Sequence, residues 1–346
     1  MLYVLTSLMA FLIAFRVSRS LANPASRLYI ADLPNERSLH VQPRPRNGGL
    51  GIMAGFLPAW MVLFGWLDHF RLPGGWLLLA GLLAIMGTSL WDDKSSLSPG
   101  VRLLSHLSAA ALIIVGGFSI DTLTLPGLDP IPLGWFGPVF SLLFIVWFLN
   151  LYNFMDGMDG FAGGMGMFGF GFFALLGWLG GNPFFLATAL LLSAANAGFL
   201  VNNFPPARIF MGDVGSVPMG FLAAALIFWA DRDHLFAPWV GVLIFSPFVV
   251  DATVTLIRRI LRREKIWQAH RSHFYQRLVL VGWNHRKTVL HEYALMITMG
   301  SGAVYLARHP EPAIQWVGLL IGVVIYGALA MAVNRQTSPG APRSSR

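Results

Sequence analysis

Long apolar runs separated by short polar segments dominate the chain. A transmembrane helix needs roughly 17–25 mostly apolar residues, and about eleven runs of this kind occur along the sequence. They lie near 2–18, 49–68, 74–90, 101–119, 133–150, 161–180, 183–202, 216–230, 236–255, 291–307 and 312–333. The first run has no basic segment before it and no small-residue cleavage site after it, which favours a retained helix over a signal peptide. The pattern predicts an all-α polytopic membrane protein with about eleven transmembrane helices.

Composition supports a membrane protein with one domain. Hydrophobic residues make up 55% of the chain and charged residues only 12%, which excludes an ordinary soluble domain. No polar linker divides the chain, so residues 1–335 are predicted to form a single integral-membrane domain. Residues 336–346, rich in Ser, Pro and Arg, are expected to be a disordered cytoplasmic tail. Because cysteine is absent, a metal would have to be held by oxygen or imidazole ligands.

The distribution of Lys and Arg predicts the orientation in the membrane. If eleven spans are assumed, all of these residues except Arg71, Arg232 and Arg308 fall on one side of the bilayer. The positive-inside rule makes that side cytoplasmic, so the N-terminus is predicted to be periplasmic and the C-terminus cytoplasmic. This location accounts for the net charge of +8, so no nucleic-acid partner is expected. The cytoplasmic connections also carry nearly every unusual polar cluster and are the predicted catalytic loops.

One acidic cluster ends the third apolar run. Asp92, Asp93 and Lys94 follow each other at the predicted membrane boundary. Adjacent carboxylates there repel each other unless a cation or a shared proton lies between them. The pair is therefore interpreted either as a solvated helix end or as a group that binds a metal or accepts a proton from a phosphate.

A row of polar residues follows the fifth run at every third position. Its members are Asn150, Asn153, Asp156 and Asp159. Nine positions at about 100° per residue place the first and last on opposite faces of a helix. The row therefore converges only if the helix ends or unwinds near Gly157. The alternatives are a plain polar cap and a site for a polar ligand.

A third carboxylate precedes the eighth run. Asp213 stands between Gly212 and Val214, and Gly215 and Ser216 follow. A glycine-flanked carboxylate before a helix suits Mg²⁺ that bridges to phosphate, although Asp213 is also interpretable as a simple helix cap.

Two basic loops complete the candidate chemistry. The loop 256–287 contains His270, Arg271 and His273, a compact set of donors suited to a pyrophosphate. Its charge alone is also what positive-inside sorting and anionic headgroups produce. The first loop contains the segment 43–49 with Arg46, and it is either a turn-rich connector or a phosphate contact.

Taken together and in this order, the segments 43–49, 92–93, 150–160, 210–216 and 270–278 resemble the polyprenyl-phosphate N-acetylhexosamine-1-phosphate transferase family. The resemblance implies a cytoplasm-facing active site in the bacterial inner membrane. It also implies transfer of an N-acetylated amino sugar-1-phosphate from a UDP-sugar to undecaprenyl phosphate, with release of UMP. Mg²⁺ is the implied cofactor, with Mn²⁺ as a substitute.

The resemblance also implies residue roles. Asp213 is the expected metal ligand, and Asp92 would deprotonate or orient the lipid phosphate with help from Asp93 and Lys94. The implied catalytic set is completed by His270 and His273 at the pyrophosphate. The implied substrate-binding residues are Asn150, Asn153, Asp156, Asp159, Arg271, Arg46, Gly215 and Ser216. The order His-Arg-Ser-His followed by Phe-Tyr-Gln-Arg resembles the branch that primes O-antigen or related polysaccharides.

Other functions and assemblies remain open at the level of sequence. A transporter of an anionic solute would also place polar groups between helices. A lipid-phosphate hydrolase would share the metal site but use water as the attacking group. Small-residue runs such as 163–166 pack helices within one chain or between two, so a homodimer is an open alternative. The identity of the sugar is not encoded in any motif recognised above.

Overall fold

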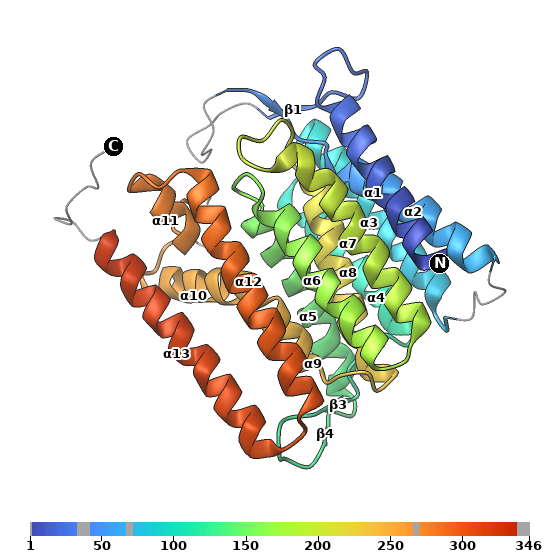
Figure 1. Ribbon diagram of the computed structural model, residues 1–346, viewed down its shortest axis with the longest axis vertical. Helices are drawn as coiled ribbons and strands as arrows, with labels where there is room; N and C mark the ends of the chain where they lie inside the picture. Colours follow the sequence, from blue (N-terminus) through green and yellow to red (C-terminus); the bar gives the residue numbers. More distant parts are fainter. Residues whose placement is uncertain (1, 33–41, 67–71, 266–269, 338–346) are drawn as a thin grey trace.

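The structure is a computed structural model of the chain that describes residues 2–32, 42–66, 72–265 and 270–337. These residues form thirteen helices and two short antiparallel hairpins (Figure 1). Arg71, the middle of the first loop and nearly all of the tail predicted to be disordered lie outside the described residues.

The helices follow the apolar runs closely. They are α1 (Leu2–Leu21), α2 (Gly49–Trp66), α3 (Gly75–Ser95), α4 (Pro99–Val115), α5 (Phe136–Met155), α6 (Phe161–Leu179), α7 (Pro183–Asn203), α8 (Asp213–Arg232), α9 (Pro238–Ile244), α10 (Ser246–Leu261), α11 (Phe274–Leu280), α12 (His285–Arg308) and α13 (Pro312–Gln336). Strands β1 (Ala31–Asp32) and β2 (Arg44–Pro45) pair in the first loop, and β3 (Thr122–Leu123) pairs with β4 (Ile131–Pro132) at the opposite end.

The structure confirms that several helices can span a membrane, but it does not confirm the predicted number of eleven. Within the described residues, seven helices are long and apolar enough to cross a bilayer, or eight if α9 and α10 count as one bent span. The apolar helices α2 and α4 are shorter. The chain is therefore a multi-pass, mostly helical membrane protein, and the count of eleven stays a prediction.

The run 236–255 forms two helices with a sharp bend between them, which the apolar pattern did not predict. Helices α9 and α10 meet at Phe245 with a bend of 84°. Pro247 lies in the first turn of α10, where its missing N–H is tolerated and a new helix is favoured. Phe245 fills the corner by packing against Phe148 and Phe170.

Helix α8 forms the centre of the bundle. Every residue from Val214 to Ala230 is buried, which explains why this helix is apolar on all sides. It packs against α3 and α5 (Figure 1). The start of α8 therefore comes close to the carboxyl ends of α3 and α5, at one end of the molecule.

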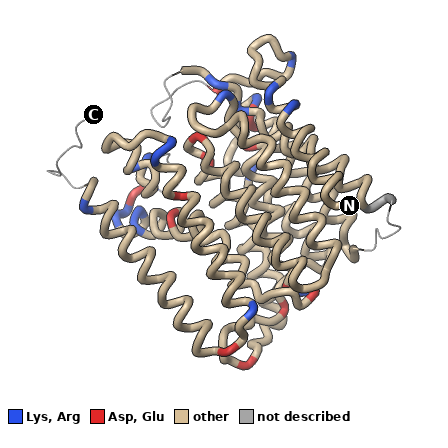
Figure 2. The backbone as a smooth tube through the Cα atoms, viewed as in Figure 1, with Lys and Arg blue, Asp and Glu red and all other residues tan. Residues whose placement is uncertain are grey.

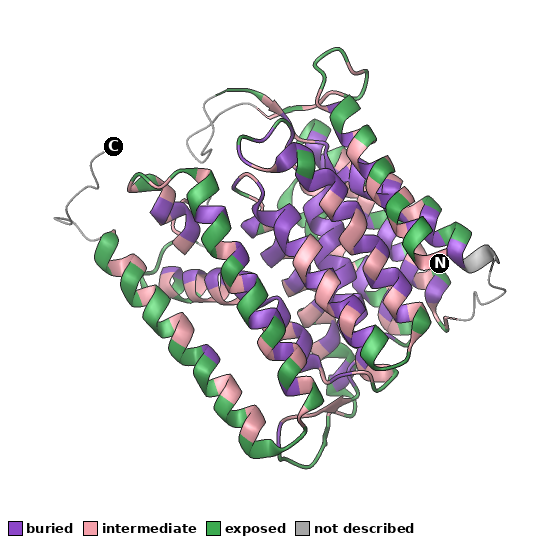
Figure 3. Ribbon diagram, in the orientation of Figure 1, coloured by how far each residue is buried: buried purple, intermediate pink, exposed green. Residues whose placement is uncertain are grey.

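Helix α13 lies at the edge of the bundle and contrasts with α8. Gly322 is its one buried residue among those described, and most of its surface is exposed (Figure 3). The Trp316 indole donates to the Pro126 carbonyl at 2.9 Å, and the hydroxyls of Tyr326 and Ser246 lie 2.6 Å apart. An apolar helix exposed in this way is suited to lipid contact.

Charged residues are distributed unevenly over the bundle. Lys and Arg gather mainly toward the end of the molecule that carries β1 and α11, as Figure 2 shows. The candidate active site lies at this same end.

Candidate active site

Three helices bring acidic side chains to one point. Asp93 comes from the last turn of α3, Asp156 follows α5, and Asp213 begins α8. The Asp93 carboxylate accepts from the backbone amides of Asp213 and Val214, at 3.3 and 3.0 Å. The carboxyl groups of Asp92 and Asp213 lie within hydrogen-bonding reach of each other. Residues more than a hundred positions apart in the sequence thus form one cluster.

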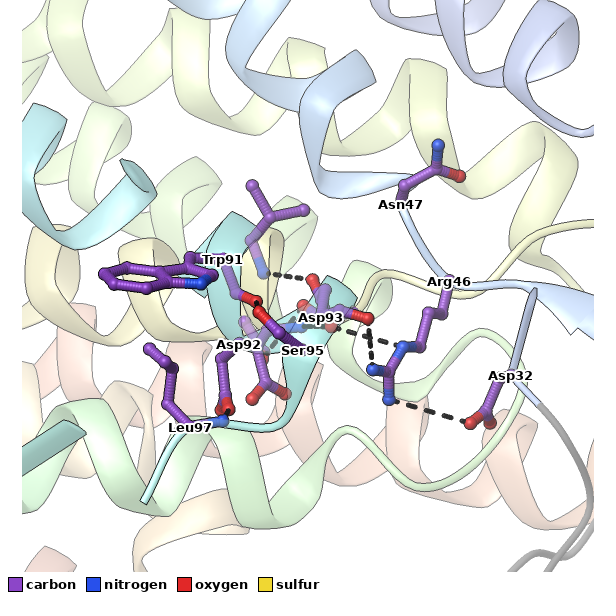
Figure 4. A network of polar contacts seen from close by, with 12 residues as sticks. Asp32, Arg46, Asn47, Trp91, Asp92, Asp93, Ser95 and Leu97 are labelled. Atoms are coloured by element: carbon purple, nitrogen blue, oxygen red, sulfur yellow. Dashed lines mark hydrogen bonds and ion pairs between the residues drawn. The ribbon is translucent and has the colours of Figure 1, made fainter. Parts of the chain in front are cut away.

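Arg46 compensates part of this negative charge. Its Nε lies 3.4 Å from Asp93 Oδ1, and its Nη1 lies 3.8 Å from Asp32 Oδ1 (Figure 4). Its guanidinium also donates to the Asp93 carbonyl. Arg46, expected to bind substrate, therefore holds Asp93 in this structure and crosslinks the first loop to the end of α3.

The first loop lies directly against the segment before α8. The Phe210 amide donates to the Pro45 carbonyl at 2.8 Å, and the Gly48 amide donates back to the Phe210 carbonyl at 2.9 Å. Gly212 has a φ of 70°, and a Cβ there would overlap with the Arg46 carbonyl oxygen. The conformation and the close approach both require glycine.

Gly215 and Ser216 were expected to bind substrate, but their contacts in this structure are internal. A Cβ at Gly215 would collide with Gly49, so this glycine allows the first loop to approach α8. The Ser216 hydroxyl donates to the Gly212 carbonyl at 3.1 Å. Both residues therefore shape the start of α8, next to Asp213.

Asn153 joins the polar row to Asp213. Its Nδ2 donates to Asp213 Oδ1 at 2.8 Å and to the Ser216 hydroxyl at 3.0 Å. These bonds orient the Asp213 carboxylate and leave its second oxygen for other partners.

Two members of the polar row, Asn153 and Asp156, approach Asp213, and α5 ends between them at Met155, close to the predicted helix break near Gly157. Burial, together with the nearby charges of Asp213 and Asp93, raises the pKa of Asp156 to about 8. Asp156 is therefore a member of the acidic cluster. The shift indicates a site that favours either a proton or a cation.

Asp159 has a different environment three residues later. It accepts from the Ala207 amide at 3.0 Å, and His285 Nδ1 lies 3.2 Å from its other oxygen. Burial raises the pKa of Asp159, but hydrogen bonds from His285 and Ala207 and the charge of Arg44 outweigh burial and lower it. Asp159 is thus a stably ionised group that joins α12 to the turn after α5.

Asn150 and Lys94 lie outside the central cluster, whereas Asp92 adjoins it beside Asp213. Asn150 Nδ2 donates to the Val146 carbonyl at 2.7 Å and lies 3.5 Å from His106 of α4, so the structure gives it no contact with Asp213. Asp92 is buried and accepts from the Leu97 amide and, at 3.3 Å, from Arg102. Lys94 is exposed.

The predicted histidine pair lies at the start of α11. His273 Nδ1 is 3.0 Å from Asp251 Oδ1, and the His270 and His273 ring centroids are 4.9 Å apart. Burial lowers the pKa of His270 to about 4, with the charges of His273 and Arg259 acting in the same direction. His270 is therefore neutral near pH 7. Arg271 is partly buried beside it.

Tyr275 connects the histidine segment to the polar row. Its side chain is fully buried and packs against Phe161, with ring centroids 4.8 Å apart. A Cβ at Gly157 would overlap with the Tyr275 hydroxyl, so the segment after α5 touches α11. Asp156 therefore lies between the carboxylates of α3 and α8 on one side and the histidine segment on the other.

Two residues that sequence reasoning did not assign hold this site together. Asp251 was noted only as a polar position near the end of a span, and His285 was counted with the basic loop. In the structure Asp251 binds the histidine segment and His285 binds Asp159. Neither has a local motif, and only the fold reveals their partners.

The acidic cluster offers Mg²⁺ a partial set of ligands. Within the described ranges, no three His, Asp or Glu side chains form a preformed metal site. Mg²⁺ usually keeps several waters and takes one or two carboxylates together with substrate phosphates. The neighbouring carboxyl groups of Asp92 and Asp213 meet that smaller requirement, because two like charges at this distance are stabilised by a cation.

Buried carboxylates, asparagine donors and basic side chains at one end of an apolar bundle define a multi-pass membrane enzyme of phosphate chemistry. The model of the family described as glycosyl transferase family 4 matches residues 75–231. This range runs from α3 to α8 and contains the acidic cluster.

Relatives of known name match most of the chain. It is 31% identical over 300 residues to the "Probable undecaprenyl-phosphate N-acetylglucosaminyl 1-phosphate transferase" of Bacillus subtilis, covering 86% of this chain and 82% of that protein. It is 30% identical over 334 residues to the "Decaprenyl-phosphate N-acetylglucosaminephosphotransferase" of Mycobacterium tuberculosis, covering 86% and 81%. It is 28% identical over 345 residues to the "Undecaprenyl-phosphate alpha-N-acetylglucosaminyl 1-phosphate transferase" of Yersinia pestis, covering 94% and 89%.

The chain therefore belongs to the polyprenyl-phosphate N-acetylhexosamine-1-phosphate transferase family, and it is a sugar-1-phosphate transferase. The family resemblance of the sequence motifs is confirmed.

Proposed function

We propose that the protein transfers an N-acetylated amino sugar-1-phosphate from a UDP-sugar to undecaprenyl phosphate. An oxygen of the lipid phosphate forms a bond to the sugar-linked phosphorus of the UDP-sugar, and the bond from that phosphorus to the bridging oxygen breaks. UMP leaves with the bridging oxygen, and a polyprenyl-diphosphate-sugar forms. The observation that carries the proposal is the convergence of Asp93, Asp156 and Asp213 at one end of an apolar bundle.

The side chains of the site supply what phosphoryl transfer needs. Charge neutralisation and in-line positioning account for most of the catalysis of such reactions. When bound, Mg²⁺ or Mn²⁺ would neutralise phosphate charge and polarise phosphate oxygens. Asp213 would hold the cation, with Asn153 orienting the carboxylate. Asp92 would orient the lipid phosphate and accept its proton, with Asp93 and Lys94 beside it.

The donor substrate would lie between the acidic cluster and the histidine segment. Asp156, near both groups, would hold the nucleotide or its pyrophosphate. Arg271, His270 and His273 would contact the pyrophosphate, with neutral His270 acting as a hydrogen-bonding group rather than a cation.

The expected setting is the bacterial inner membrane with the active site facing the cytoplasm. The gathering of Lys and Arg at the end that carries the site supports this orientation. The names of the relatives specify N-acetylglucosamine, so UDP-N-acetylglucosamine is the first donor to test. The expected biological role is priming of O-antigen or a related cell-envelope polysaccharide.

The decisive experiment measures UMP release by the purified protein. The assay contains undecaprenyl phosphate, Mg²⁺ and a panel of UDP-N-acetyl sugars, with Asp213→Asn and Asp92→Asn in parallel. We expect release that depends on the lipid and falls by at least about 10²-fold in either variant, the size typical of a lost electrostatic catalyst.

The outcomes separate the alternatives. Release of UMP without lipid phosphate would indicate a hydrolase. No release from any sugar by folded protein would refute the substrate assignment and direct attention to transport of an anionic solute, measured in liposomes.

A further inference from the structure

The strongest unassigned feature is the carboxylate of Asp251. The residue lies on α10 and is only 7% exposed. Burial of an ionisable group within a membrane protein costs free energy unless other polar groups interact with it, and such groups often have a function. The partners of Asp251 are therefore informative.

Three of these partners belong to the histidine segment. Asp251 Oδ1 lies 3.0 Å from His273 Nδ1 and accepts from the Phe274 amide at 3.1 Å. Its Oδ2 accepts from the Tyr275 amide at 3.4 Å. A fourth partner, the Thr255 hydroxyl, donates from within α10 at 3.0 Å. One carboxylate thus fixes three consecutive residues of a different element.

The bond to His273 has a chemical consequence as well as a structural one. A carboxylate accepts hydrogen bonds, so its partner nitrogen Nδ1 carries the proton and the tautomer of the ring is set. The Nε2 atom then remains for other partners. Since the His273 side chain is only 5% exposed, its ring has little freedom to adopt another orientation.

The same carboxylate aligns the histidine segment with the acidic cluster. Asp251 holds the Tyr275 backbone, and the Tyr275 hydroxyl abuts Gly157 next to Asp156. A displacement of the start of α11 would therefore move the histidines relative to Asp156.

We infer that Asp251 is a positioning residue for the reaction, which sets the tautomer of His273 and the place of the His270–Arg277 segment beside Asp156. This inference rests on the proposed sugar-1-phosphate transfer. Asp251 acts through His273 and has no direct role at the reacting phosphorus.

The test is a double-mutant cycle with Asp251→Asn and His273→Gln, in which UMP release gives kcat and KM for the UDP-sugar. Asn removes the charge and presents an amide N–H to groups that are themselves donors. Because misplacement by about 1 Å costs on the order of 10²-fold, we expect Asp251→Asn to lower kcat by about that factor with little change in KM. In the double variant, the factors by which the two single substitutions lower kcat should not multiply, because both substitutions remove the same Asp251–His273 interaction.

Matched variants separate positioning from general destabilisation. Thr255→Val removes a partner of the same carboxylate without touching the histidine segment, and its kcat should stay within about threefold of wild type, as for an ordinary local change. Asp251→Glu keeps the charge, and its kcat should lie between wild type and Asp251→Asn. If Asp251→Asn is not recovered folded, the cycle is run with Asp251→Glu.

Each result decides the inference. Losses that multiply in the double variant, or a kcat within threefold of wild type for Asp251→Asn, would overturn it. Non-additive losses with an unchanged apparent Tm would support it. If wild type itself releases no UMP, the proposed function fails, and this outcome is distinct from failure of the positioning role.

Discussion

At the scale of single residues, the site works through pairs in which one side chain orients another. Asn153 and Asp213 are such a pair, with 2.8 Å between Nδ2 and Oδ1. Removing a hydrogen-bond partner of a metal ligand typically costs 10–100-fold in metal affinity or activity. We therefore expect Asn153→Ala to raise the Mg²⁺ concentration needed for half-maximal UMP release by about that factor.

The matched control is another asparagine paired with an aspartate. Asn182 donates to Asp233 at 3.0 Å in a pair distinct from the Asn153–Asp213 pair. Asn182→Ala should leave the Mg²⁺ dependence unchanged. An equal shift in both variants would contradict a specific role for Asn153.

The neutral state of His270 gives a prediction about pH. Its pKa of about 4 lies below the ordinary value of 6.5, because burial and the nearby charges of His273 and Arg259 disfavour the cation. As pH falls from about 6.5 toward 4, the unfolded chain binds a proton that folded His270 does not, so the free energy of unfolding decreases. His270→Gln should therefore lose less apparent Tm than wild type between about pH 7 and pH 5.

The measurement is thermal unfolding in detergent at the two pH values. His291→Gln, at an exposed position of α12, serves as the control. A larger acid-induced loss of apparent Tm in His270→Gln than in wild type would show that the sign is wrong.

At the scale of elements, the contact between the first loop and the start of α8 depends on glycine. Gly212 has a φ of 70°, and a Cβ there would overlap with the Arg46 carbonyl oxygen. Gly181, between α6 and α7, has a nearly equal φ of 69°, but nothing lies near its missing Cβ. The two positions therefore separate backbone strain from steric overlap.

Gly181→Ala should lower the free energy of unfolding by about 1 kcal/mol, the cost of left-handed backbone in a residue with a Cβ. Gly212→Ala introduces the same backbone strain, and its Cβ also overlaps with the Arg46 carbonyl oxygen. This overlap should displace Arg46 and its partner Asp93. We expect it to reduce UMP release by at least about 10²-fold, the effect of a small misplacement in an active site. The free energy of unfolding and the rate of UMP release are measured for both variants. Equal losses of activity in the two variants would argue against the close approach of Gly212 to Arg46.

The helices and their contacts also show which features of the structure are predictable from the sequence alone. Apolar runs predicted the helices well because lipid imposes length and hydrophobicity on each of them. The bend at Phe245 was missed because apolar residues continue on both sides of it, although Pro247 was a local signal. The family resemblance implied that Asp156 and Asp213 serve one active site, whereas the contacts of Asp251 and His285 involve partners distant in sequence that no motif indicated.

At the scale of the whole molecule, the position of the site at one end of the bundle links chemistry to topology. In the proposed reaction, a charged nucleotide sugar would arrive from water, whereas a polyprenyl phosphate would keep its chain in the bilayer. A site at the end of α3, the end of α5 and the start of α8 would be accessible to both substrates. Most Lys and Arg lie toward the same end, which is the arrangement expected of a cytoplasmic face.

The absence of cysteine makes this topology directly testable. Single cysteines at exposed Ser96, Asp129 and Arg335 report on the end of α3, the β3–β4 hairpin and the end of α13. With eleven crossings and a periplasmic N-terminus, an impermeant thiol reagent added to intact cells should label Asp129→Cys only. Ser96→Cys and Arg335→Cys should react fully once the membrane is permeabilised, because both would face the cytoplasm. With a periplasmic N-terminus, labelling of Arg335→Cys but not Ser96→Cys from outside would mean an even number of crossings. Labelling of Ser96→Cys from outside would place the acidic cluster on the wrong side for a cytoplasmic nucleotide sugar.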